Sequence, residues 1–221
     1  MKGHAERFEP LKLYQILKKH FGPSNWWPGE SPFEIIVGAV LTQNTSWANV
    51  EKAIINLKAA DKLDIDSIMQ MGLSEFAELI RPSGYYNLKA GRIKNLIDAI
   101  YSDSGSDLNL FLSKEPELLR NKLLEVKGIG KETADSICCY AAEKCVFVVD
   151  AYTKRILSRH GVINELWDYD MVQDLFEKGF ADNIEIYKDL HAYMVFIGKE
   201  FCKKKTPVCG QCPLKDWEQT P

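Results

Sequence analysis

The run Lys127-Gly128-Ile129-Gly130-Lys131 constrains this chain most, because it places a short loop between two helical patterns. The two glycines allow positive φ and leave no side chains over the loop, so backbone N–H groups can converge on an anion there. The lysines add positive charge. The same residues also suit an ordinary corner between helices, with glycine as a C-cap. A Gly-x-Gly run alone leaves both interpretations open.

Asp150 lies twenty residues beyond that loop, after the apolar run Val146–Val149 and before a helical pattern that begins near Tyr152. An aspartate at this place can simply be the N-cap of the following helix. A carboxylate held by backbone amides is also fixed in position. It therefore suits a group that stabilises developing positive charge or activates water, and the two roles are compatible.

Apolar residues recur at helical spacing along most of the chain, between short connections rich in Gly and Pro. The run Pro32–Gln43 is apolar almost all round and predicts a buried helix. The small residues of Thr133–Ala142 predict another helix. Strand-like alternation never exceeds four residues, and no Asn-Gly hairpin signal occurs. We predict an all-α fold.

Composition limits the classes of partner. The net charge of −3 argues against a protein that coats nucleic acid by bulk electrostatics, but it permits a local basic face. No apolar run approaches the roughly 18–20 residues of a membrane span, and the charged N-terminus Met1–Glu6 has no apolar signal region. We expect no membrane partner and a cytoplasmic protein, associated with the nucleoid if the cell is prokaryotic.

Three of the six cysteines (Cys202, Cys209 and Cys212) lie within eleven residues of a tail rich in Lys, Pro and Gly. Soft thiolates at such spacing suit an iron–sulfur cluster or zinc. The remaining three lie on or just beyond the helix predicted at Thr133–Ala142, where a packed apolar role is favoured.

Together these motifs resemble the helix–hairpin–helix DNA glycosylases of the endonuclease III superfamily. The hairpin pattern, from Leu124 to Ala134, and the aspartate of Val148-Val149-Asp150 carry the resemblance, which extends from the Trp26 region to the cysteine tail. It implies two helical domains with an active-site cleft between them. Residues 26–149 would form a six-helix domain ending in the hairpin, and residues 1–25 with 150–221 a second domain that carries the cysteine loop 202–212.

The resemblance also implies a monomer that acts on double-stranded DNA and flips a damaged base out of the stack. Residues Lys127, Gly128, Ile129, Gly130 and Lys131 would bind DNA, and Asp150 would be catalytic. In the lyase members of the family a lysine stands two residues after the second loop glycine. Glu132 occupies that position here. Lys131 precedes it by one, which turns its side chain by about 100° on a helix. The pattern therefore favours a monofunctional glycosylase.

Aromatic residues indicate the substrate. By their resemblance to the 3-methyladenine glycosylase branch, Trp26 and Trp47 would sandwich the base, with Trp27 and Pro28 as walls. A methylated purine carries positive charge, so stacking on tryptophan gains a cation–π attraction of about 1–2 kcal/mol when desolvated. The alternative is that the tryptophans belong to the core.

Gln43 and Asn44 are the candidates to enter the gap that the flipped base leaves. They belong to a polar run between two predicted helices.

The cysteine tail resembles the [4Fe–4S] loop of endonuclease III, which reads Cys-x6-Cys-x2-Cys-x5-Cys. Glu218 stands where the fourth cysteine would fall. A [4Fe–4S] cluster, zinc and a loop without metal all stay open.

The sequence favours a glycosylase for alkylated purines such as 3-methyladenine. An endonuclease III-like glycosylase and lyase for oxidised pyrimidines, or a mismatch glycosylase, remain alternatives. So does a non-catalytic helix–hairpin–helix module that only binds DNA, although it would not explain Asp150 and the tryptophans. A small-molecule enzyme is disfavoured by the two-glycine loop.

Overall fold

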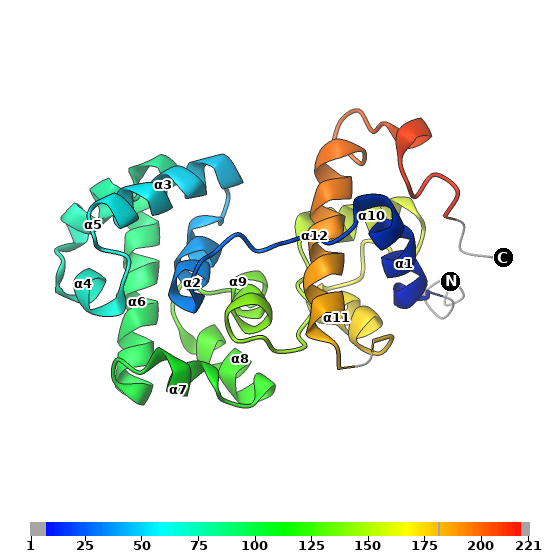
Figure 1. The fold of residues 1–221 in the computed structure, drawn as a ribbon. Coiled ribbons are helices and arrows are strands. Elements are labelled where there is room, and N and C mark those ends of the chain that lie inside the picture. The colour runs from blue at the N-terminus through cyan, green and yellow to red at the C-terminus, as the bar shows by residue number, and fades with distance from the viewer. Residues whose placement is uncertain (1–7, 181, 218–221) are drawn as a thin grey trace. The chain divides into compact units, whose positions relative to one another are not determined.

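A computed structural model describes residues 8–180 and 182–217. These residues form helices and connecting loops, and no strand occurs among them (Figure 1). The prediction of an all-α fold is confirmed. None of the helices within these ranges is long and apolar enough to cross a bilayer.

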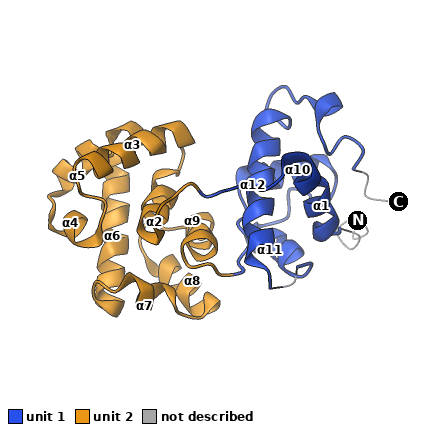
Figure 2. Ribbon diagram, in the orientation of Figure 1, with its two compact units in different colours: residues 1–27, 145–221 blue, residues 28–144 orange. Residues whose placement is uncertain are grey.

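The chain divides into two compact units (Figure 2). Unit 1 comprises residues 1–27 and 145–221, and unit 2 comprises residues 28–144.

Unit 2 contains α2 (Pro32–Leu41), α3 (Trp47–Ala59), α4 (Ile65–Gln70), α5 (Leu73–Leu79), the 3₁₀ turn η2 (Arg81–Ser83), α6 (Tyr86–Ser104), α7 (Leu108–Leu112), α8 (Pro116–Glu125), α9 (Lys131–Ser136) and the π-helical turn η3 (Ile137–Ala141). The predicted buried helix is α2, which packs against α3, α6, α9 and η3. It starts where the Ser31 hydroxyl accepts a hydrogen bond from the Glu34 N–H at 3.2 Å.

The prediction of one helix over Thr133–Ala142 was wrong in its helix type after Ser136. The α-helix ends at Ser136, and the next five residues form the π-helical turn η3, in which the Ala142 N–H donates to the Ile137 carbonyl five residues back. The turn buries every one of its side chains, including the thiols of Cys138 and Cys139. The expected apolar packing of these two cysteines is confirmed.

Unit 1 contains α1 (Pro10–Phe21), α10 (Ala151–Arg159), α11 (Tyr169–Glu177), α12 (Ile184–Glu200) and the 3₁₀ turn η4 (Cys209–Gln211). Helix α12 packs against both α1 and α10. Gly198 permits the close approach of α10, because a Cβ atom there would lie 2.1 Å from Cδ1 of Tyr152. Most of the α12 side chains are buried, so this helix forms the centre of the unit.

Lys89 is an unexpected buried cation in unit 2, with a side chain that is only 1% exposed. Its Nζ donates to the carbonyls of Leu41 at 2.8 Å and Ser83 at 2.6 Å. These bonds tie the end of α2, where the polar run 42–46 begins, to the η2 turn. Burial, with a smaller contribution from the charge of Arg92, lowers the pKa of Lys89 to about 8.

This lowered pKa makes the stability of the fold depend on pH. Above pH 8 Lys89 loses its proton in the folded chain, whereas the unfolded chain keeps this proton up to the usual lysine pKa of about 10.4. Because the unfolded state binds more protons in this window, the free energy of unfolding rises with pH. The quantity to measure is the free energy of unfolding of the parent minus that of Lys89→Met, each obtained by urea titration. This difference should increase between pH 7 and 10.5, by at most about 3 kcal/mol. Parallel pH profiles for the two proteins would contradict this.

Candidate active site

The predicted hairpin lies between α8 and α9 in unit 2 and begins with a tight turn from Val126 to Ile129. The Ile129 N–H donates to the Val126 carbonyl at 3.0 Å, and Gly128 has a φ of +98°. Lys127, the second residue of the turn, does not have positive φ, so the turn is of type II, which favours glycine at its third position. The local sequence therefore forms this turn because Gly128 supplies the required conformation.

Gly128 is also required by packing. A Cβ atom at this position would lie 2.4 Å from Cγ of Arg92, on α6, and 2.9 Å from its Cδ. The backbone of the loop therefore rests directly on the arginine side chain. Any other residue at 128 would both strain the turn and displace Arg92.

Side-chain amides hold two successive carbonyls of the turn. Asn95 Nδ2 donates to the Lys127 carbonyl at 3.1 Å, and Gln43 Nε2 donates to the Gly128 carbonyl at 3.2 Å. Gln43 Nε2 also donates to Thr133 Oγ1 at 2.9 Å, and its Oε1 accepts a hydrogen bond from Arg92 Nη1. The loop is thus held by α6 and by the run that follows α2.

Exposure separates the loop residues into two groups. Lys127, Gly128, Gly130 and Lys131 are exposed, whereas Ile129 is 5% exposed and anchors the loop in the core of unit 2. The five residues predicted to bind DNA therefore present glycine backbone and two lysines to solvent. Their geometry suits an anion-binding loop.

A partly buried ion pair joins the two helices that flank the hairpin. The Asp135 carboxylate is fully buried, and Arg120 binds it through Nε at 2.6 Å and Nη2 at 3.2 Å. This two-bonded contact joins α8 to α9, the two helices that the hairpin connects. The sequence analysis missed Arg120, Asp135, Arg92 and Asn95, because single polar residues within helical patterns carry no local signal.

Asp150 is the N-cap of α10 in unit 1. Its Oδ1 accepts a hydrogen bond from the Thr153 N–H at 2.7 Å, and the side chain is 7% exposed. The capping role that its sequence position indicated is therefore present. One carboxylate oxygen is fixed by the backbone, and the second lies 3.9 Å from Nε2 of His191.

His191 belongs to α12 and is 5% exposed. Burial lowers its pKa, and the nearby Asp150 carboxylate opposes this only in part. The histidine is therefore mainly neutral near pH 7 and acts on Asp150 as a dipole rather than as a full charge. The sequence analysis did not identify His191, which lies forty-one residues from Asp150.

Trp26 and Trp27, two of the four predicted base-pocket residues, lie at the end of the first segment of unit 1, and both are half-buried. Their rings lie 5.9 Å apart at an angle of 62°, and Trp26 also contacts Phe196 edge-on at 6.0 Å. Lys199 Nζ lies 5.6 Å from the centre of the Trp26 ring. This face of Trp26 therefore already accepts a cation.

The segment before these tryptophans is anchored to α12. The Ser24 N–H donates to Asp189 Oδ1 at 3.2 Å, and the Tyr193 hydroxyl donates to the Gly22 carbonyl at 2.5 Å. Two side chains of one helix thus hold the backbone that leads to Trp26.

The other residues predicted to contact the base or the gap belong to unit 2. Pro28 is exposed, and Trp47 is half-buried at the first position of α3. Asn44 is exposed in the turn between α2 and α3, with a φ of +54°. The unit that carries the hairpin therefore also carries Trp47, Gln43 and Asn44.

The three tail cysteines form no disulfide in the described part of the chain; Cys202 is half-buried, Cys209 exposed and Cys212 buried. Arg159 organises the start of this loop: Nη1 donates to Cys202 Sγ at 3.2 Å and to the Lys203 carbonyl, and Nη2 donates to the Lys204 carbonyl. Within residues 8–180 and 182–217, no three Cys, His, Asp or Glu side chains are placed to hold a metal. Glu218 lies outside the described residues.

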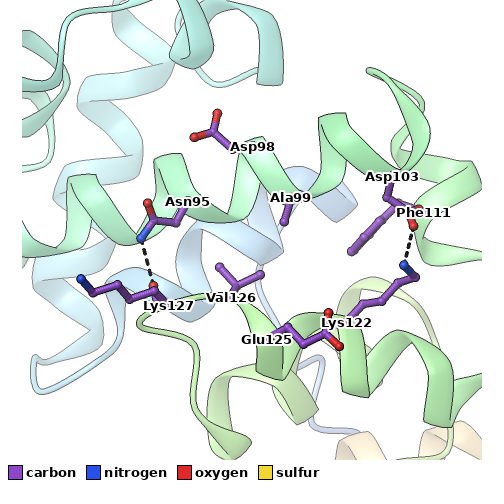
Figure 3. A pocket seen from close by; sticks show the side chains of 9 residues that line it. All are labelled: Asn95, Asp98, Ala99, Asp103, Phe111, Lys122, Glu125, Val126 and Lys127. Carbon is purple, nitrogen blue, oxygen red and sulfur yellow. Dashed lines mark hydrogen bonds and ion pairs between the residues drawn. The ribbon is translucent and has the colours of Figure 1, made fainter.

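A cleft of about 320 Å³ lies in unit 2 between α6, α7 and α8 (Figure 3). Three carboxylates (Asp98, Asp103 and Glu125) line it, with Lys122 bound to Asp103 at 2.7 Å. It contains no tryptophan and none of the residues predicted to hold a base. Only Lys127, at one end, belongs to the predicted site.

Comparison with known proteins places these features in a family. Residues 37–182 match the HhH-GPD superfamily of base excision DNA repair proteins. A Methanocaldococcus jannaschii protein, whose name describes it provisionally as a DNA repair glycosylase, is 48% identical over 96% of both chains.

Solved structures agree with this assignment. The 3-methyladenine DNA glycosylase of H. pylori, bound to 1,N6-ethenoadenine, is 35% identical, with a TM-score of 0.75 over 87% of this chain and 98% of that one. An endonuclease III–DNA complex shares the fold, with a TM-score of 0.78 and 22% identity over 95% of this chain and 94% of that one. The chain belongs to the HhH-GPD superfamily of base excision DNA repair proteins.

Proposed function

We propose that this protein is a monofunctional DNA glycosylase that removes alkylated purines such as 3-methyladenine from double-stranded DNA. The observation that carries the proposal is the hairpin, which exposes glycine backbone and two lysines while Ile129 anchors it in the core. The likeness to the H. pylori 3-methyladenine glycosylase, at 35% identity, supports the substrate class.

Asp150 supplies the chemistry in this proposal. Water attacks the anomeric carbon of the sugar as the bond from that carbon to the base breaks, and the base leaves with the bonding electron pair. The Asp150 carboxylate stabilises the positive charge that develops on the sugar and accepts the proton of the attacking water. A cationic methylated purine departs as a neutral base, so no general acid is needed.

Asp150→Asn tests this role without removing the helix cap, because asparagine caps helices as well as aspartate does. We expect single-turnover base release from methylated DNA to fall by at least about 100-fold, while the Kd for the same DNA changes less than threefold. Asp168→Asn is the matched control: Asp168 caps α11 through the Met171 N–H at 2.9 Å. Retained base release in Asp150→Asn would contradict the assignment.

Stacking supplies substrate recognition in this proposal. Trp26 and Trp47 would stack on the base, with Trp27 and Pro28 beside it. The cation that already lies over Trp26, the Lys199 ammonium, supports the idea that this ring can hold a positively charged group.

Trp47→Ala should therefore reduce 3-methyladenine release by about tenfold at saturating protein, which corresponds to the cation–π range of about 1–2 kcal/mol. The affinity for undamaged duplex should stay within threefold of the parent. Trp167→Ala, at another half-buried tryptophan, controls for general destabilisation. Equal losses in excision and in binding would show that Trp47 is only structural.

Asn44 and Gln43 are the proposed occupants of the gap left by the base. Asn44 is exposed in the turn between α2 and α3. Gln43 would first have to break its bonds to Gly128, Thr133 and Arg92.

The absence of lyase activity is proposed from Glu132. It stands in the first turn of α9, where the lyase members have their nucleophilic lysine, and a carboxylate cannot form a Schiff base. Borohydride added during turnover on methylated DNA should trap no covalent protein–DNA adduct, in an assay where a bifunctional endonuclease III is trapped. A trapped adduct would show that another amine, such as the adjacent Lys131, acts as nucleophile.

A further inference from the structure

We propose that Asn95 is a positioning residue for phosphate binding, because it fixes the orientation of the central peptide of the hairpin turn. This inference rests on the proposed function, in which the hairpin contacts the DNA backbone. Asn95 lies on α6 and is not itself part of the hairpin.

The central peptide, between Lys127 and Gly128, has two possible orientations. Turns of types I and II differ by a flip of this peptide, and glycine at the third position permits both. Asn95 Nδ2 donates to the Lys127 carbonyl at 3.1 Å (Figure 3). The bond is available only when that carbonyl points toward α6, so Asn95 selects the type II form.

The orientation of the carbonyl determines that of the amide. In a trans peptide the C=O and N–H groups point in opposite directions. With the Lys127 carbonyl directed at α6, the Gly128 N–H is directed away from α6, on an exposed residue. The next amide, that of Ile129, is already used inside the turn. Asn95 thus presents the Gly128 N–H to a phosphate.

The rest of the turn does not depend on Asn95. The Ile129–Val126 bond and the bond from Gln43 to the Gly128 carbonyl remain when the Asn95 amide is removed. The predicted consequence is therefore specific: the loop persists, but its central peptide populates both orientations. The amide then faces the DNA for only part of the time, and affinity falls.

Asn95→Ala should raise the Kd for an undamaged DNA duplex about threefold, as expected if about one third of the molecules keep the competent orientation, measured by fluorescence anisotropy between 50 and 200 mM salt. No charge is removed, so the slope of log K against log[salt] should stay unchanged, whereas Lys131→Ala should reduce that slope by about one unit. The matched control is Asn56→Ala. Asn56 Nδ2 makes an equivalent bond to the Leu79 carbonyl, at 3.0 Å, elsewhere in unit 2.

Asn56→Ala should match Asn95→Ala in thermal stability and bind DNA with a Kd within about 1.5-fold of that of the parent. Equal loss of affinity in both variants, or parent-like affinity in Asn95→Ala, overturns the positioning role while the proposed function stands. A parent protein that fails to bind duplex DNA overturns the proposed function and this inference together.

Discussion

The hairpin depends on one constraint at Gly128, where positive φ and close packing coincide. The type II turn needs a residue that adopts a φ of +98°, and the Arg92 side chain fills the space that a Cβ atom would take. Arg92 also orients Gln43, which holds the Gly128 carbonyl. At Gly128 the hairpin therefore contacts both helix α6, through Arg92, and the segment after α2, through Gln43. The exposure of both lysines and the burial of Ile129 follow from this arrangement.

In unit 1, the bond by which Asp150 caps α10 also holds its carboxylate in one position, as the proposed catalytic role requires. The bond to the Thr153 N–H fixes the carboxylate without consuming its second oxygen. His191, made mainly neutral by burial, lies near that oxygen without the full charge that would compete with a cationic sugar. The capping bond is therefore compatible with the proposed catalytic role of Asp150.

Short-range patterns predicted much of this molecule, whereas contacts between distant helices were not predictable. Glycine spacing indicated the hairpin, and the apolar run of Pro32–Gln43 indicated a buried helix, which in the structure ends at Leu41. Asn95, Arg92 and His191 act across long sequence separations, so nothing near them in the chain reveals their partners.

Two further features also escaped prediction. The π-helical turn has no signal separate from that of an α-helix, since the same small and apolar residues suit both. The contacts of Arg159 with the start of the cysteine loop also had no local signal, because Arg159 and Cys202 are far apart in the sequence.

The most direct measurement is base release from duplexes that carry an alkylated purine, an oxidised thymine or a T·G mismatch, with and without subsequent alkali. We predict rapid release of the alkylated purine, little release of the other two bases, and strand cleavage only after alkali. Preferential release of oxidised thymine, or a strand cut before alkali is added, would contradict a monofunctional glycosylase for alkylated purines.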